Sequence, residues 1–264
     1  MGVNRRGFFK IAGITALGLA GAKPAVNALS GKSLPDPAEE REDLAGKRWA
    51  VAIDLKKCKS DEGCRDCVNV CHTRHNVPDF GNKKDEIKWI WTEEFPHAFT
   101  EQEHELVADD LKEKPVPVFC NHCDNPPCTR VCPTKATFKR ADGVVVMDWH
   151  RCIGCRYCMA ACPYGSRSFN WRDPRPFIKD MNPEYPTRSH GVVEKCTLCD
   201  GMPNDAGKID GLPHPACVKA CPENAMIFGD LEDPESDIRA ILKDRFSIRR
   251  KPGLGTQPEI YYLV

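Results

Sequence analysis

The feature that most constrains this chain is its cysteine content, because its sixteen cysteines fall into four groups of four. Cysteine is several times more frequent here than in an ordinary soluble protein. Aromatic residues, by contrast, make up only 8% of the 264 residues. A conventional apolar core would be thin for a chain of this length, so we expect the cysteines to help hold the fold together.

The spacing within the four groups is regular. Group one reads C-x5-C-x2-C-x3-C over residues 58–71, group two C-x2-C-x4-C-x3-C-P over 120–133, group three C-x2-C-x2-C-x3-C-P over 152–163, and group four C-x2-C-x17-C-x3-C-P over 196–222. Group three matches the bacterial ferredoxin run, in which three cysteines wrap one cubane cluster and the fourth ligates the other cluster of a pair. Sixteen cysteines, at four per cubane, predict four [4Fe-4S] clusters with no thiol left over.

Three other interpretations of the cysteines stay open. Eight disulfides would suit an exported protein, but they would not require the C-x2-C-x2-C-x3-C-P run. Structural zinc also uses C-x2-C pairs, but its sites lack a four-cysteine run with a trailing proline. A set with one cluster lost, or of the three-iron type, is the third alternative. No ligand position carries a different residue, which argues against it.

The first 28 residues have the pattern of an export signal. The pair Arg5-Arg6 is followed by an apolar run over 11–22 and by small residues up to Ala28. This pattern is typical of a twin-arginine signal peptide, with Asn4 where Ser or Thr is usual. The apolar run has about 12 residues, short of the roughly 20 that a spanning helix needs. We expect cleavage after Ala28, with retention as a short anchor as the alternative.

The export route agrees with the cluster interpretation. Clusters are assembled in the reducing cytoplasm, and the twin-arginine route carries proteins that are already folded. The sequence therefore predicts a periplasmic location, or one on the extracytoplasmic face of the cytoplasmic membrane. Without residues 1–28 the chain is acidic by four charges.

The rest of the chain predicts an α+β fold with short strands around the cysteine groups. Asp142-Gly143 marks a hairpin turn, and Asp233 followed by Pro234 predicts a helix that runs to about Asp244. Recurrent cysteine groups with flanking strands indicate duplicated bacterial-ferredoxin-like iron–sulfur domains with short β-hairpins, a cluster-dominated core and a C-terminal helix and strand extension. The expected strands are 49–55, 87–91, 116–119, 137–139, 144–147, 225–228 and 259–264. The expected domains are the signal segment 1–28, a linker 29–48 and one four-cluster ferredoxin domain 49–264.

Charge and motif content exclude several functions. The 38 Lys and Arg balance the 38 Asp and Glu, and a chain without a long basic run is not expected to bind nucleic acid. No C-x-x-C-H haem motif and no nucleophile–base set occurs, so we expect neither a bound haem nor a self-contained enzyme. Eight basic residues lie near cysteines in sequence and either offset cluster charge or are solvated: Arg130, Lys135, Arg140, Arg151, Arg156, Arg167, Lys195 and Lys219. We expect His72, His75 and His122 to be hydrogen-bonding neighbours or surface residues rather than ligands.

Groups two to four resemble the four-cluster ferredoxin family of respiratory electron-transfer subunits. The resemblance rests on Cys120-Asn121-His122-Cys123, on the run from Cys152 to Gly165, and on Lys195-Cys196-Thr197-Leu198-Cys199. It implies electron transfer without catalysis, and crossed ligation in which group one pairs with four and group two with three. Group one departs from the family pattern in its five-residue gap and in His72, where proline is usual. The implied sites are A (Cys58, Cys64, Cys67, Cys221), B (Cys196, Cys199, Cys217, Cys71), C (Cys120, Cys123, Cys128, Cys162) and D (Cys152, Cys155, Cys158, Cys132).

Within that family the similarity narrows to the DsrO group, the exported ferredoxin subunits of the DsrMKJOP membrane complex of sulfate-reducing organisms. The twin-arginine signal and the stretches 182–188 and 191–196 carry this similarity. It implies a polytopic quinone-interacting membrane subunit and a multihaem cytochrome c as partners, and a link to dissimilatory sulfite reduction. The alternative is the electron-transfer (beta) chain of an exported molybdopterin oxidoreductase. A structural zinc or disulfide protein is the alternative from another class.

Overall fold

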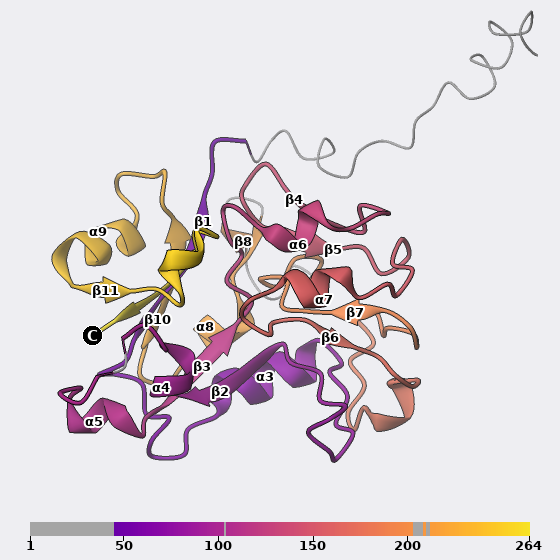
Figure 1. Cartoon of the computed structure of the whole chain (residues 1–264), viewed down its shortest axis with the longest axis horizontal. Coiled ribbons are helices and arrows are strands. Elements are labelled where there is room, and N and C mark those ends of the chain that lie inside the picture. Colours follow the sequence, from indigo (N-terminus) through magenta and orange to yellow (C-terminus); the bar gives the residue numbers. More distant parts are fainter. Residues whose placement is uncertain (1–44, 103, 203–207, 210–211) are drawn as a thin grey trace, which may run out of the picture. The chain divides into compact units, whose positions relative to one another are not determined.

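The computed structural model describes residues 45–102, 104–202, 208–209 and 212–264, shown in colour in Figure 1. These residues all belong to one unit, Arg41–Val264. The expected signal segment and most of the expected linker lie outside the described residues. Among the described residues, no helix has the length and apolar character needed to cross a membrane.

The largest sheet joins segments that lie far apart in the sequence. Its strand order is β10-β1-β12-β11. The central strand β1 pairs antiparallel with β10 and parallel with β12, with Val51 opposite both Phe228 and Ile260. The four strands are β1 (Trp49–Asp54), β10 (Met226–Asp230), β11 (Ser247–Ile248) and β12 (Ile260–Leu263). The C-terminal strand is therefore no peripheral extension, because it lies beside β1 within the sheet.

The two faces of β1 pack against different partners, as the two-residue period of a strand requires. Val51 and Ile53 belong to the main apolar core, whereas Ala50 and Ala52 pack with Ile238 of helix α9 (Asp237–Asp244) on the other face. The neighbouring strand allows the same close approach, since a Cβ on Gly229 would come within 2.9 Å of Ile238 Cγ2. Small residues on this face let α9 cover the sheet.

The predicted start of α9 is wrong by three residues, because the N-cap is Ser236 rather than Asp233. Asp233 was expected to cap the helix, but the helix begins at Asp237. Asp233 Oδ1 instead accepts a hydrogen bond from the Glu235 N–H at 2.9 Å, and the Ser236 hydroxyl donates to the carbonyls of Asp230 and Asp233. These local bonds form a turn that ends before the helix begins.

The predicted strand 87–91 is shifted along the chain. Strand β2 spans Ile90–Glu94 and pairs antiparallel with β3 (Pro115–Phe119), beginning with Ile90 opposite Phe119. The Lys88 N–H donates to the Ser168 hydroxyl at 2.8 Å, so it bonds a side chain rather than the backbone of β3. Helices α4 (Phe95–Ala98) and α5 (Asp109–Lys112) lie between β2 and β3 in the sequence.

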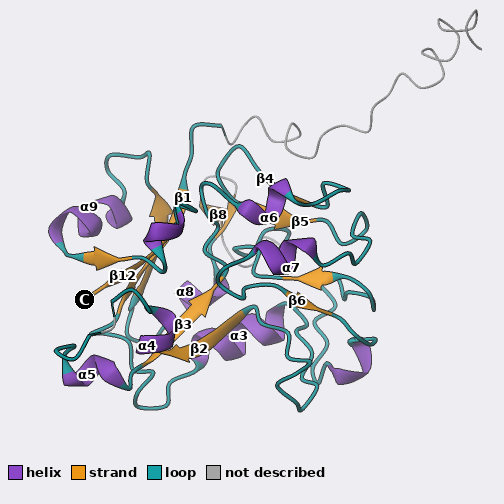
Figure 2. Cartoon of the chain, in the orientation of Figure 1, coloured by secondary structure: helices purple, strands orange, loops and turns teal. Residues whose placement is uncertain are grey.

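Four helices that carry cysteines pack in two pairs. Helix α3 (Asp66–Arg74) contacts α8 (Ala216–Lys219), and α6 (Pro127–Arg130) contacts α7 (Tyr157–Ala161). Figure 2 shows these helices among loops and short strands. Group one thus meets group four, and group two meets group three.

The remaining elements are short. Figure 1 shows α6, α7 and the antiparallel strand pairs β4–β5 and β6–β7 on one side of the view, with β1, β10 and α9 on the other. The remaining strands are β4 (Thr137–Lys139), β5 (Val145–Met147), β6 (Ser168–Phe169), β7 (Val193–Glu194), β8 (Lys208–Ile209) and β9 (Leu212–Pro213), and two 3-10 turns span Arg175–Phe177 and Pro252–Leu254. The predicted hairpin around Asp142-Gly143 is confirmed, with Gly143 in the left-handed region at φ +83°.

The described residues form more than one apolar core. The main core surrounds β1, β2 and β3 and includes cysteines of groups one and four. A smaller core contains Cys128 and Cys158 together with Val145, Met147 and Val193. The fold is a mixture of short helices and strands, and the cysteines lie within its cores.

Candidate iron–sulfur sites

The structure gathers twelve of the sixteen cysteines around three cavities. All sixteen lie in the described part of the chain, and none is joined to another by a disulfide. Their cysteines are those of site A (Cys58, Cys64, Cys67, Cys221), site C (Cys120, Cys123, Cys128, Cys162) and site D (Cys132, Cys152, Cys155, Cys158).

The other four cysteines come together in the interior. Burial raises the pKa of the Cys71 thiol well above its usual value, and the nearby thiolate charges of Cys196, Cys217 and Cys199 raise it further. Burial likewise raises the pKa of Cys217, with Cys199 and Cys196 adding to the effect. All four residues are buried. They are the four cysteines of site B.

Helical periodicity explains how one group serves two sites. Cys67 and Cys71 are four residues apart on α3, about one turn. The first lies at site A and the second at site B. Cys217 on α8 and Cys221 just beyond it repeat this arrangement in the opposite direction. The packing of α3 against α8 therefore brings the two groups into the same pair of sites.

The four sites lie in a row, in which each site neighbours the next. The thiolate charge of Cys67, at site A, raises the pKa of Cys71 at site B. Burial is the main cause of the raised pKa of Cys196 at site B; Lys195 opposes it, and the charge of Cys120 at site C adds to it. Burial is also the main cause of the raised pKa of Cys158 at site D, and the charge of Cys128 at site C adds to it. The order is therefore A, B, C and D.

The loop of group three depends on backbone conformations that its sequence provides. Gly154 has φ +70°, and a Cβ there would lie 2.4 Å from the Gly191 carbonyl oxygen. Such a contact is closer than atoms can approach, so only glycine fits. Arg156 also lies in the left-handed region, at φ +63°. These two residues turn the chain so that the three cysteines of the loop line one cavity.

Backbone N–H groups point at several of the sulfurs. The N–H groups of Leu198, Ala216 and Ala225 donate to the Sγ atoms of Cys196, Cys199 and Cys221 at 3.4, 3.3 and 3.2 Å. At Cys132, burial opposes ionisation, but the N–H groups of residues 134, 136 and 137 and the Thr134 hydroxyl lower its pKa overall. Such donors stabilise thiolate sulfur and tune a cluster that it holds.

The eight basic residues near the cysteines differ in how deeply they are buried. Arg140, Arg167 and Lys195 are buried, whereas Arg130, Lys135, Arg156 and Lys219 are exposed and Arg151 is half-buried. Arg140 pairs with Asp142 and Asp200, both at 2.5 Å. Lys195 donates to the carbonyls of Val145 and Cys196. Sequence proximity alone did not separate these buried cations from solvated ones.

The three histidines hydrogen bond with the backbone, as expected for neighbours of the sites. His72 Nε2 lies 3.1 Å from the Ile90 carbonyl oxygen, and His75 Nδ1 lies 2.9 Å from that of Cys71. His122 Nδ1 accepts the Val145 N–H at 3.1 Å. Burial lowers the pKa of His75 to about 4, so its imidazole is neutral near pH 7.

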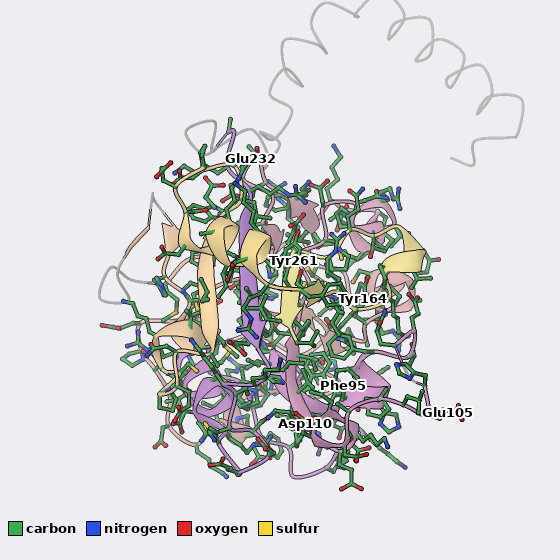
Figure 3. All side chains as sticks on the ribbon, turned by 90° about the vertical axis from the view of Figure 1, so that its left-hand side faces the viewer. Phe95, Glu105, Asp110, Tyr164, Glu232 and Tyr261 are labelled. Atoms are coloured by element: carbon green, nitrogen blue, oxygen red, sulfur yellow. The ribbon has the colours of Figure 1, made fainter. Side chains whose placement is uncertain are left out.

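The sequence did not predict that Thr256 contributes to site C. Tyr164, labelled in Figure 3, lines the cavity and bonds through its hydroxyl to that of Thr256. Burial raises the pKa of Cys123 to about 12, while a hydrogen bond from Thr256 acts in the opposite direction. Thr256 lies far along the chain from groups two and three and belongs to no motif, so no sequence signal pointed to it.

The sites fit a polynuclear iron–sulfur group better than a single ion. A four-cysteine zinc site needs all four sulfurs about 2.3 Å from one point, and no group of His, Cys, Asp or Glu in the described ranges is gathered for a single ion. Burial raises the pKa of Cys67 to about 12, so this thiolate needs nearby positive charge, which cluster iron supplies. The four sets would then hold one cluster each.

Comparisons with known proteins agree with this chemistry. Residues 112–176 and 151–226 each match a 4Fe-4S dicluster domain family. The chain is 39% identical over 274 residues to the Hdr-like menaquinol oxidoreductase iron–sulfur subunit 1 of Archaeoglobus fulgidus. That alignment covers 98% of this chain and 97% of the relative. The chain is 37% identical to the menaquinone reductase iron–sulfur cluster-binding subunit of Nitratidesulfovibrio vulgaris (82% and 88% covered) and 35% identical to the arsenate respiratory reductase iron–sulfur subunit ArrB of a Shewanella species (82% and 96% covered).

The fold and the cysteine sites define a protein that carries 4Fe-4S clusters in ferredoxin-like dicluster domains. The chain belongs to the family of iron–sulfur electron-transfer subunits of respiratory oxidoreductase complexes. It is thus a non-catalytic subunit, as the sequence predicted. Group one lies outside both matched domains, so its place at sites A and B rests on the geometry described above.

Proposed function

We propose that this chain holds four [4Fe-4S] clusters on its sixteen cysteines and relays electrons between two redox partners of a respiratory membrane complex. The observation that carries the proposal is the order of the sites, because four neighbouring thiol sets make a path from A to D. When bound, the clusters supply reversible one-electron chemistry. The cysteines hold them, backbone N–H groups orient the sulfurs, and the apolar cores limit access of water.

The partners we propose are a polytopic quinone-interacting membrane subunit and a multihaem cytochrome c, in a complex of the DsrO kind that is linked to dissimilatory sulfite reduction. Two relatives support the quinone side of this proposal. One is named as a subunit of a menaquinol oxidoreductase and the other as a subunit of a menaquinone reductase. The similarity over residues 182–188 and 191–196 supports the DsrO group.

Anaerobic purification of the protein from gently solubilised native membranes tests both parts of this proposal. We expect about sixteen iron ions per chain, at four per cubane, and co-purification of a polytopic membrane subunit and a protein with a c-type haem spectrum. Zinc instead of iron would refute the clusters. A large molybdopterin protein as the main companion would refute the DsrO-like partners and leave the clusters in place.

A second candidate is the electron-transfer (beta) chain of an exported molybdopterin oxidoreductase. Its support is the relative named as the iron–sulfur subunit of an arsenate respiratory reductase, which matches 82% of this chain. That candidate keeps the same sites and the same electron-transfer role. It differs only in the catalytic partner, so the purification above distinguishes the two.

We also propose that the twin-arginine route delivers the loaded protein to the extracytoplasmic face of the membrane. The support is the Arg5-Arg6 signal pattern of residues 1–28. Replacing both arginines by lysine is expected to reduce export at least about tenfold, because this route reads the arginine pair. Immunoblotting of cell fractions measures the result. Unchanged extracytoplasmic protein in the double variant would contradict this route.

A further inference from the structure

A buried arginine lies between sites C and D. The side chain of Arg167 comes from the segment after group three, and the residue is only 4% exposed. Its Nη2 donates to the Sγ of Cys128 at 3.0 Å and to the hydroxyl of Thr137 at 2.7 Å. Its Nη1 lies 3.9 Å from the sulfur of Met147. The guanidinium is thus held against one cysteine of site C.

The same guanidinium also reaches site D, because Met147, whose sulfur lies near its Nη1, lines the site D cavity. Burial raises the pKa of Cys158, and the charge and hydrogen bond of Arg167 oppose that rise. Burial alone would lower the pKa of Arg167 itself, but the thiolates of Cys128 and Cys158 raise it overall. One cation therefore contacts a cysteine sulfur of site C and a residue that lines site D.

Arg167 has no carboxylate ion-pair partner among the residues that the structure describes; its contacts are sulfurs and a hydroxyl. The buried Arg140 and Arg188, by contrast, each pair with an acid. A guanidinium is charged at any ordinary pH, and burying a charge without a counter-charge is costly. The negative charge that balances Arg167 is that of the groups at sites C and D, since a four-thiolate cubane carries about −2 when oxidised.

We propose that Arg167 is a positioning residue that sets the reduction potentials of sites C and D together. This inference rests on the proposed function, because both sites must hold clusters. Reduction of a cluster adds one electron and makes it more negative. A fixed positive charge in a buried position stabilises the reduced form more than the oxidised form. Arg167 therefore raises both potentials above the values that the same thiols would give without it.

The position of Arg167 has a consequence for the A-to-D path. The cation lies at the last two sites of the path, and none of its hydrogen-bond partners in the described part of the chain belongs to site A or site B. Raising the potentials of C and D together favours an electron at these two sites over one at A or B. Because the two sites gain from the same charge, the difference between the potentials of C and D changes less than either potential.

The test is a redox titration, followed by electron paramagnetic resonance, of the anaerobically purified protein carrying R167Q, R167K or R156Q. Glutamine removes the charge and keeps a hydrogen-bond donor, whereas lysine keeps the charge at a shorter reach. Arg156 is the matched control, because it is an exposed arginine of the site D loop that lies over the ring of Trp171 at 4.7 Å. Signals are assigned to sites with single cysteine-to-serine variants.

We expect R167Q to lower the potentials of C and D and to leave A and B unchanged. R167K should give a smaller shift in the same direction, and R156Q a small shift at D alone. If R167Q binds no clusters at C and D, the potentials of R167K test the inference instead. The inference is overturned if the Arg167 variants that bind clusters have the same potentials at C and D as the unchanged protein. An absence of clusters in the unchanged protein would instead refute the proposed function.

Discussion

Replacing Glu194 by alanine is expected to lower the stability of the loaded protein by about 3–5 kcal/mol, the usual cost of leaving a buried charge without its partner. The side chains of Glu194 and Arg188 are both fully buried, and Arg188 Nη2 lies 2.7 Å from Glu194 Oε2. The same oxygen accepts the Trp89 indole N–H at 2.9 Å, and Oε1 accepts the amide of Asn170. Alanine would remove the acceptor from all three donors.

This buried pair also supports site B. Arg188 donates to the carbonyls of His75 and Asn76, and the ring centres of Trp89, Trp149 and Tyr185 lie 5.3, 5.6 and 5.9 Å from its guanidinium. His75 in turn bonds to the Cys71 carbonyl, and Glu194 lies two residues before Cys196. We therefore expect the Glu194 variant to lose the site B cluster before the others.

Anaerobic unfolding in guanidinium chloride measures the effect. Glu184→Ala is the matched control, since it is the same change at an exposed glutamate and should leave the midpoint almost unmoved. A double variant, Arg188→Met with Glu194→Leu, should recover only part of the loss, because it removes the unpaired buried charge but leaves the Trp89 N–H and the Asn170 amide without their acceptor. Equal midpoints for the Glu194 and Glu184 variants would contradict a stabilising role for this pair.

The parts of the fold that sequence predicted are those set by local spacing. The hairpin around Asp142-Gly143 needs only a turn dipeptide between two short apolar runs, and it forms where expected. The cysteine sets follow from short gaps within each group together with the crossing rule of the family. The structure places those same sets together, while their ligation of iron stays a prediction for experiment.

The parts that sequence did not predict depend on contacts between distant segments. Nothing local to residues 260–263 indicates that they pair in parallel with β1, near the other end of the described chain. Likewise Arg130 and Arg167 look alike beside their cysteine groups, but one is exposed and the other buried between two sites. The burial of a charge is decided by the packing of the whole chain, so sequence spacing cannot show it. The shifted start of α9 has a local cause, the competing turn at Asp233.

The second large effect is expected at site D. Cys155→Ser should abolish the cluster of site D and leave those of sites A and B intact. The reason is that site D is lined by the loop of group three and Cys132, beside a small core that includes Cys158, Val145 and Met147. Sites A and B instead belong with α3, α8 and the main core. Loss of one ligand should therefore remain local.

Iron analysis and electron paramagnetic resonance of the anaerobically purified variant measure this result. Iron should fall from about sixteen to about twelve ions per chain, at four per cubane. The matched variant Cys64→Ser should remove the cluster at site A and spare site D, because its thiol lines the cavity at the other end of the path. If either variant loses all four signals, cluster binding and folding form one cooperative unit. The two apolar cores would then not be independent supports, and the chain would bind its clusters together or not at all.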